Sequence, residues 1–191
     1  HSHRRLFRYN AKMNFCSHCG HSLEQKIPDG DNRQRYVCSR CGAVHYENPK
    51  VIVGCVPIHQ DKVLLCKRAI EPRLGLWTLP AGFMENGESL AEGAVRETLE
   101  EANASVKPSD LYTIFSLPHI SQVYVFFLSE LNNLDFYPGE ESLETKLFSE
   151  DQIPWSELAF PVISETLRNY FSDRAENSLK IRYSDGLFDR R

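Results

Sequence analysis

Three glutamates near the middle of the chain, Glu97, Glu100 and Glu101, have the spacing i, i+3 and i+4. In a helix this spacing places all three carboxylates on one side. Carboxylates so close together repel one another, and a helix that only needed stability would carry Lys or Arg there. The cluster therefore predicts a bound cation, and oxygen ligands of this kind suit Mg²⁺ first and Mn²⁺ next.

Four cysteines near the N-terminus predict a second metal site. Two Cys-x2-Cys pairs are separated by 18 residues, the spacing of a structural zinc ribbon, and the ligands would be Cys16, Cys19, Cys38 and Cys41. Gly20 and Gly42 follow the two pairs and permit the left-handed turns that such a site needs. A shell of four thiolates leaves no open position, so this zinc would hold structure and perform no chemistry.

Two alternatives to four cysteine ligands remain for this segment. The cysteines would form two disulfides in an oxidising compartment, but no secretory signal marks the chain for export. His18 and His21 lie close enough in sequence to substitute as ligands, although four cysteines already complete the shell. We therefore interpret both histidines as exposed loop residues.

The helix that positions the carboxylates is predicted to begin after Ser89. Ser89 and Glu92 have the spacing of a capping box. A helical projection places an apolar face toward the rest of the fold, made of Leu90, Ala91, Ala94, Val95, Thr98, Leu99 and Ala102. Arg96 is expected to bridge to Glu92 or Glu100 and hold the carboxylates in position.

Gly93 lies within the acidic side of this helix, where glycine costs about 1 kcal/mol relative to alanine. We hypothesise that its missing side chain gives a metal-bound phosphate room to approach. On this hypothesis, an alanine at position 93 would leave folding intact or improve it, but would weaken activity.

The remaining elements are mostly strands. Hydrophobic and β-branched content predicts a hairpin of 51–58 with 62–66, and further strands at 111–117 and 122–129. Cys55 and Cys66 fall inside the hairpin and are expected to be buried free thiols. A second helix is predicted at 160–171 from its apolar spacing, and it would cover the sheet.

Composition indicates a folded chain with two unlike parts. The 191 residues are 41% hydrophobic and 11% aromatic, which argues against disorder, and no apolar run approaches the length of a membrane span. Residues 1–50 carry nine Lys and Arg against four Asp and Glu, although the whole chain has a net charge of −4. A basic front favours a polyanion such as nucleic acid, but a solvated surface explains it equally well. A cytoplasmic location follows by default.

We divide the chain into four parts. They are an N-terminal arm or expression remnant (1–12), a zinc ribbon (13–48), a catalytic domain (49–175) and a C-terminal tail (176–191).

The segment from Gly82 to Ala104 resembles the Nudix box, G-x5-E-x7-R-E-U-x-E-E-x-G-U, where U is aliphatic. Every charged position of the box matches. Thr98 stands where an aliphatic residue is usual and can pack through its methyl group, while Asn103 replaces the closing glycine as the next-best residue for a left-handed cap. Neither departure touches a charged position.

The resemblance implies an α/β Nudix fold, a mixed β-sheet between helices, that hydrolyses a nucleoside diphosphate derivative with Mg²⁺ or Mn²⁺. Glu97, Glu100 and Glu101 would be metal ligands, with Glu97 also a candidate general base, and Glu88 and Arg96 would orient them. A main-chain carbonyl of Ala81 or Gly82 would complete the shell, and Glu141 would add a carboxylate from a later loop.

A four-cysteine ribbon before a Nudix domain resembles the NADH pyrophosphatases. Their Ser-Gln-Pro-Trp-Pro-Phe-Pro array is absent, and the segments 48–50, 75–82 and 138–144 are more similar to the ribbon-bearing plant pyrophosphatases of FAD and ADP-ribose. The implied reaction yields AMP with FMN or ribose 5-phosphate. Phe83 and Tyr124 would stack on adenine or flavin, and the relatives suggest a homodimer.

Other functions are the weaker alternatives. The substrate would be NADH or the capped end of an RNA, or the chain would be a nucleotide sensor whose ribbon binds nucleic acid. The intact acidic set argues against a sensor, since a protein that only senses has no evident need for every catalytic carboxylate.

Overall fold

The computed structural model describes residues 13–185 and divides the chain into two compact units, His1–Pro49 and Lys50–Arg191. The expected arm at 1–12 lies outside the described residues. We describe each unit by itself. Within the described part of the chain, no helix is long and apolar enough to cross a membrane.

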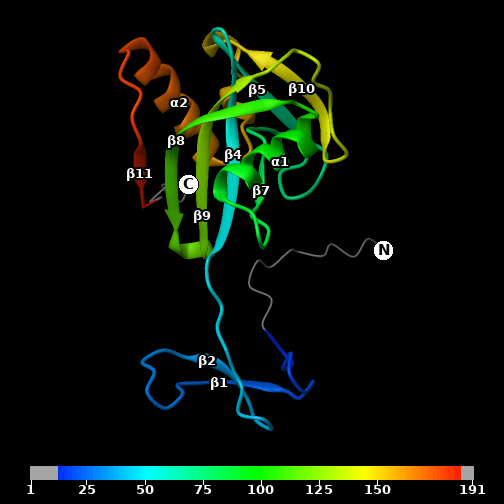
Figure 1. Ribbon diagram of the computed structural model, residues 1–191, viewed down its shortest axis with the longest axis vertical. Helices are drawn as coiled ribbons and strands as arrows, with labels where there is room; N and C mark the ends of the chain where they lie inside the picture. Colours follow the sequence, from blue (N-terminus) through cyan, green and yellow to red (C-terminus); the bar gives the residue numbers. More distant parts are fainter. Residues whose placement is uncertain (1–12, 186–191) are drawn as a thin grey trace. The chain divides into compact units, whose positions relative to one another are not determined.

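The first unit is a small antiparallel sheet with the order β1-β2-β3. Its strands are β1 (Leu23–Lys26) and β2 (Arg35–Cys38), labelled in Figure 1, and β3 (Val44–His45). Gly20 and Gly42 adopt φ values of 71° and 72°, so both cysteine pairs end in the left-handed turn that the sequence predicts.

The second unit is built on one mixed sheet with the order β10-β5-β4-β9-β8-β11. Its long strands are β4 (Lys50–His59), β5 (Lys62–Arg68), β8 (Val106–Leu117), β9 (Gln122–Leu131) and β10 (Ser142–Phe148). Three short strands join them, namely β6 (Trp77–Thr78), β7 (Ala81–Phe83) and β11 (Arg182–Ser184). The helices are α1 (Leu90–Ala102) and α2 (Pro161–Ala175), and 3₁₀ turns lie at Pro118–Ile120, Glu150–Gln152 and Trp155–Glu157.

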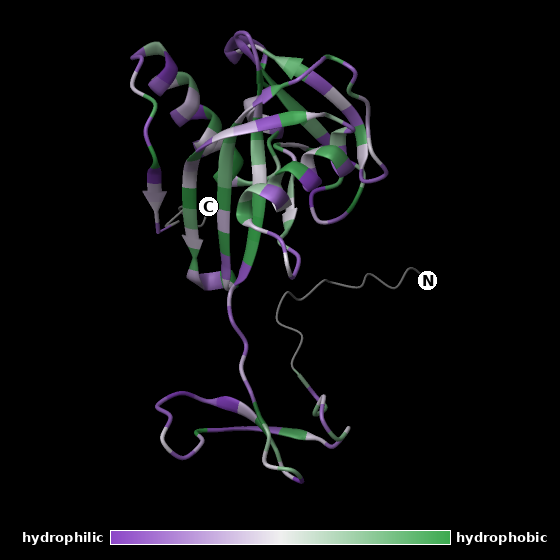
Figure 2. Cartoon of the chain, viewed as in Figure 1, coloured by the Kyte–Doolittle hydropathy of each residue, from purple (hydrophilic) through white to green (hydrophobic). Residues whose placement is uncertain are grey.

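The two helices pack against two separate apolar clusters. Val53 and Cys55 of β4 join the cluster that contains Ala94 of α1, whereas Val56 joins the cluster that contains Ile163 and Leu167 of α2. Because side chains alternate across a strand, β4 contributes to both faces of the sheet. Figure 2 shows hydrophobic residues concentrated along β4 and β9, the strands at the centre of the unit.

The sequence predicted the main elements of this framework, but it did not predict the short strands β6 and β7. The hairpin, the strands at 111–117 and 122–129 and both helices are present, and Cys55 and Cys66 are buried free thiols. The strand β10 was not predicted, because only two of its seven residues are buried and its pattern is polar. The predicted tail at 176–191 contains β11, which pairs in parallel with β8.

A buried carboxylate explains why β11 joins the sheet. Asp173 of α2 is fully buried and is paired with the Arg182 side chain of β11. The Tyr112 hydroxyl of β8 donates to the same carboxylate at 2.9 Å. This network ties β11, α2 and β8 together.

Candidate active site

The helix α1 has the two caps that the sequence predicts. The Ser89 hydroxyl accepts from the Glu92 backbone N–H, and the Glu92 side chain accepts from the Ser89 N–H. At the other end Asn103 is left-handed with a φ of 46°, and its N–H donates to the Leu99 carbonyl. These caps fix where the helix begins and ends, and with that the direction of its glutamates.

The buried face of α1 differs from the projection. Thr98 is fully buried as expected, but Leu99 is 52% exposed and therefore lies outside the core. Glu97 and Glu101 are only 9% and 7% exposed and face the sheet. Glu100 stays exposed. The carboxylates thus occupy part of the core side of the helix, which a hydrophobicity projection assigns to apolar residues.

Arg96 holds several of the acidic side chains. Its guanidinium group donates to both oxygens of Glu88 at 2.8 and 3.0 Å, to Glu97 Oε1 at 2.7 Å and to Glu100 Oε2 at 3.1 Å. The hydrogen bonds from Arg96 hold the pKa of Glu88 at about 2, so Glu88 is ionised at neutral pH. The expected bridge to Glu100 is present. The alternative bridge to Glu92 is not, because the Glu92 side chain caps the helix.

Glu101 is buried with no arginine or lysine bonded to it in residues 13–185. Its Oε2 accepts a hydrogen bond of 3.2 Å from the Ala81 N–H of β7. Burial raises the pKa of Glu101 to about 8, and the charges of Glu97 and Glu141 add to the rise. Burial also raises the pKa of Glu97, despite its bond to Arg96. The ionised forms of both carboxyls therefore need more positive charge than the described residues supply.

The strand β7 lies directly against these carboxylates. A Cβ at Gly82 would collide with the Glu97 carboxylate, so only glycine fits between β7 and α1. The neighbouring Ala81 contributes its N–H to Glu101. The segment that would supply a main-chain carbonyl ligand is thus in contact with two of the predicted carboxylate ligands.

Gly93 has a different role from the one the sequence suggests. It is buried, and a Cβ there would approach Glu88 Oε1 at 2.6 Å and Val53 Cγ2 at 2.8 Å. The missing side chain makes room for the sheet and for Glu88, not for a phosphate. The prediction that alanine leaves folding intact is therefore wrong, because an added methyl group at this contact overpacks the interface.

A pH-dependent stability follows from Glu101. The pKa of its carboxyl is about 4.5 when exposed and about 8 in the fold, so the folded state binds the proton more tightly than the unfolded state does. The stability contributed by the protonated carboxyl is therefore fully present below pH 4.5 and is lost as the pH rises through 8. At pH 7 the free energy of unfolding is lower by about 3 kcal/mol than at low pH on this account. Without added divalent ions, the Tm of the wild type should fall from pH 5 to 8 relative to that of Glu101→Gln.

Added Mg²⁺ should reverse this fall, and it should stabilise the wild type more at pH 8 than at pH 5. Chelators are avoided in these scans because they would also remove zinc. Parallel Tm curves for the two proteins across this pH range would contradict the prediction.

The acidic side chains fit a divalent cation. The donors are hard oxygens, two of them are buried like charges, and Glu101 has no cationic partner bonded to it among the described residues. The carboxylate oxygens do not lie as close to one another as the cysteine sulfur atoms do. The Arg96 guanidinium group lies between the carboxylates and bonds both Glu97 and Glu100. Glu141 is exposed on the loop before β10, close enough for its charge to act on Glu97 and Glu101.

The four cysteines of the first unit fit zinc. Their sulfur atoms all lie within 4.8 Å of one another, and three pairs are separated by 3.5 to 3.7 Å. A tetrahedral ion with bonds of about 2.3 Å needs sulfur atoms about 3.8 Å apart. Backbone N–H groups, first that of Cys41, lower the pKa of the Cys38 thiol to about 6. Despite the backbone N–H of Ala43, hydrogen bonds with the neighbouring thiols raise the pKa of Cys41 to about 12, so without metal the sulfur atoms share protons.

Comparison with known proteins identifies the family of both units. Residues 48–170 match the NUDIX domain, and residues 14–47 match the Nudix N-terminal zinc ribbon. The chain belongs to the Nudix family. A Nudix hydrolase from Nitrosomonas europaea has a solved structure that is 55% identical, with a TM-score of 0.88, covering 90% of this chain and 98% of that one.

The curated relatives are named for two different activities. An NAD-capped RNA hydrolase from Enterobacter sp. (strain 638) is 27% identical over 152 residues, which are 78% of this chain and 56% of that protein. An ADP-ribose pyrophosphatase from Methanocaldococcus jannaschii is 31% identical over 121 residues, or 60% of this chain and 69% of that protein. The chain spans about half the length of the NAD-capped RNA hydrolases it matches.

The Nudix sheet brings the two predicted stacking residues into one row. Ile52 of β4 pairs with Phe83 of β7 on one side and with Tyr124 of β9 on the other. Residues paired in this way point to the same face, here about 10 Å apart across two strand spacings. Phe83 is 40% exposed, whereas Tyr124 is half-buried, stacks on Phe126 and packs against the apolar cluster of α2. The row therefore lies on the face of the sheet opposite α1.

Two basic residues, one near Phe83 and one near Glu101, were not predicted as site residues. The Lys50 ammonium group lies 5.1 Å from the centre of the Phe83 ring. The charge of Arg68 lowers the pKa of Glu101, although less than burial raises it. Both lie outside the Nudix box, and only their position in the folded sheet reveals them.

Proposed function

We propose that this chain hydrolyses the diphosphate bond of a nucleoside diphosphate derivative with the help of Mg²⁺ or Mn²⁺. The observation that carries the proposal is the pair of buried carboxylates, Glu97 and Glu101, which face β7 with too little positive charge of their own. A site of this kind is unfavourable for packing alone, and it suits an ion that brings an anionic substrate to the protein.

The residues of the site would have two roles, to bind the metal ions and to position the ligands. Glu97, Glu100, Glu101 and Glu141, with the carbonyl of Ala81 or Gly82, would hold the ions. Bound divalent ions supply charge neutralisation for the diphosphate and a water of lowered pKa. Glu88 and Arg96 position the ligands, since Arg96 bonds Glu88, Glu97 and Glu100 at once.

Glu97 is the candidate general base. Arg96 donates to its Oε1, which leaves Oε2 to accept a proton from the attacking water. The raised pKa of Glu97 brings it nearer to neutrality, where a carboxylate is a more effective base. Glu101 would serve as a ligand, because its oxygen is held by the Ala81 N–H.

The substrate we favour is FAD or ADP-ribose, giving AMP with FMN or ribose 5-phosphate. Phe83 and Tyr124 would hold a planar ring between them above Ile52, as their common row allows. The named activity of the archaeal relative supports ADP-ribose. The named activity of the bacterial relatives makes NADH or NAD-capped RNA the second candidate.

Charge does not favour a nucleic-acid-binding ribbon. Four of the nine basic residues of 1–50 lie at 1–12, and residues 13–49 carry four basic and four acidic side chains. The described ribbon is therefore close to neutral.

A cytoplasmic homodimer is also part of our proposal, by analogy with ribbon-bearing relatives, and light scattering after size-exclusion chromatography tests the dimer.

A substrate panel tests the proposal. We expect release of AMP from ADP-ribose, FAD and NADH in the presence of Mg²⁺ or Mn²⁺, and no release without added divalent ions. The ranking of kcat/KM then identifies the substrate. Binding of these nucleotides without cleavage of any of them would overturn the proposed hydrolysis and favour the sensor.

A further inference from the structure

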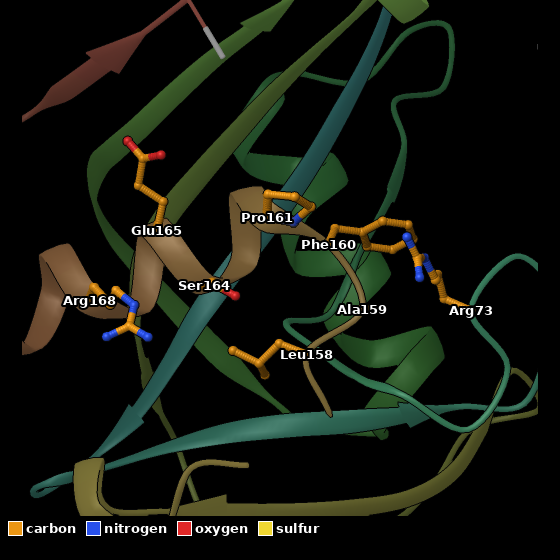
Figure 3. A pocket seen from close by; sticks show the side chains of 8 residues that line it. All are labelled: Arg73, Leu158, Ala159, Phe160, Pro161, Ser164, Glu165 and Arg168. Atoms are coloured by element: carbon orange, nitrogen blue, oxygen red, sulfur yellow. The ribbon is translucent and has the colours of Figure 1, made fainter. Parts of the chain in front are cut away.

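A cavity of about 480 Å³ opens at the start of α2, and the proposed reaction does not use it. Its lining includes the side chains of Leu158, Phe160, Ser164, Glu165 and Arg168, and Arg73 reaches it from the loop after β5 (Figure 3). The lining thus combines apolar surface with two guanidinium groups. Such a combination suits a ligand with both a ring and an anionic group.

The two arginines of this cavity are available to a ligand. Arg73 and Arg168 are exposed, and neither has a carboxylate within 4.0 Å in the part of the chain from 13 to 185. Glu165 is the acidic residue of the lining, and its side chain extends away from the Arg168 guanidinium group in Figure 3. The cavity therefore presents unpaired positive charge.

Two guanidinium groups at the cavity stack on aromatic rings. The Arg168 guanidinium lies 4.4 Å from the centre of the Trp155 ring, and that of Arg68 lies 5.3 Å from the centre of the Phe160 ring. A guanidinium group stacked on a ring keeps its N–H edge free, and that edge matches the oxygens of a phosphate. Arginines interleaved with aromatic rings are typical of surfaces that bind single-stranded nucleotide chains.

The segment from Arg68 to Arg73 connects the cavity to the active site. Arg68 stacks on Phe160 of the cavity, and its charge also acts on Glu101. The next residue, Ala69, donates its N–H to the carbonyl of Glu141 at 2.8 Å. The loop therefore borders the proposed metal ligands at one end and the cavity at the other.

We propose that this cavity binds a nucleoside phosphate, with Phe160 beside the base and with Arg73 and Arg168, which lie at opposite ends of the lining, supplying positive charge for phosphate groups (Figure 3). The continuity through Arg68 favours a nucleotide of an RNA chain joined to the diphosphate being cleaved, as in NAD-capped RNA, the second candidate substrate. A free mononucleotide is the other source of the same chemistry. For its kinetic test this inference rests on the second candidate substrate of the proposed function, NAD-capped RNA, but the binding it predicts can be measured separately.

The test compares Arg73→Glu/Arg168→Glu with Lys107→Glu/Lys180→Glu, which makes the same change of charge at exposed residues outside the cavity. The substrates are NADH and a short RNA capped with NAD. We expect KM for the capped RNA to rise at least fivefold in the arginine variant and to stay within twofold in the lysine variant. In both variants, kcat and KM for NADH should stay within twofold.

A second arm measures AMP as an inhibitor of NADH hydrolysis. Weaker inhibition in the arginine variant, with KM for the capped RNA unchanged, would assign the cavity to a free nucleotide. Unchanged KM and unchanged inhibition would overturn the proposal. Circular dichroism confirms that both variants fold, and Arg73→Glu alone repeats the test without disturbing the contact of Arg168 with Trp155.

Failure of the proposed hydrolysis is distinguishable from failure of this inference. If the wild type cleaves neither substrate, fluorescence anisotropy of a labelled ten-nucleotide RNA replaces the kinetics. We expect the Kd of the arginine variant to be at least fivefold weaker than that of the lysine variant. Equal values of Kd would overturn the cavity as a nucleotide site, whatever the chemistry of the carboxylates.

Discussion

Replacement of Glu97 by Gln should lower kcat for the preferred dinucleotide by about three orders of magnitude. The change removes the proton acceptor of the attacking water, which is worth about 10²–10⁴-fold in rate. It also removes one charged metal ligand, so the concentration of Mg²⁺ for half-maximal rate should rise. Steady-state rates of AMP release over a range of Mg²⁺ concentrations measure both effects.

The matched control is Glu92→Gln on the same helix. Glu92 is exposed, and its side chain caps α1, a role that Gln also fills in a capping box. Its kcat should stay within twofold of the wild-type value. The Glu97 variant should be no less stable than the wild type without divalent ions, since burial already disfavours the ionised Glu97 carboxyl. A kcat within tenfold of wild type in Glu97→Gln would show that Glu97 is neither base nor ligand.

The charged residues of the Nudix box could be predicted from the sequence because they are local in the chain. Caps depend on residues three or four apart, so Ser89 with Glu92 and the left-handed Asn103 follow from spacing alone. The bond between Arg96 and Glu100 has the same short range. Such features are decided before tertiary packing.

The orientation of α1 could not be predicted because the site overrides hydrophobicity. A projection gives the buried face to Leu99 and the exposed face to Glu97 and Glu101, and the structure reverses both assignments. The reason is that β7 approaches the glutamates through Gly82. This contact joins a strand residue to a helix residue, so spacing within the helix does not reveal it. Gly93 was misread for the same reason, since Val53 of β4 fills the space beside it.

The cavity at α2 was beyond prediction from sequence. Arg73 belongs to the loop after β5, whereas Phe160 and Arg168 come from the other end of the domain. No spacing rule connects these positions, and only the pairing of the strands brings them together. The same holds for Phe83 and Tyr124, which β4 places in one row through Ile52.

Removal of zinc should unfold the first unit. Among its described residues, the buried hydrophobic side chains are those of Cys16, Val37 and Cys38, and two of these three are proposed metal ligands. Phe15 and Tyr46 are exposed. A unit this small without an apolar core depends on its metal, and zinc binding to such modules supplies about 10–16 kcal/mol. Cys19→Ser should therefore abolish the protection of peptides from 14–47 against hydrogen exchange.

The second unit should respond differently, because β4 and β9 have a large apolar core of their own. Their peptides should stay protected in Cys19→Ser, while the zinc content falls from one ion per chain to nearly none. His21→Ala is the control and should keep its zinc, since the four sulfur atoms already complete the shell. If the native mass instead lacks four hydrogens and no zinc is present, the cysteines form two disulfides. In that case the ribbon is held by covalent bonds, and removing metal would leave it folded.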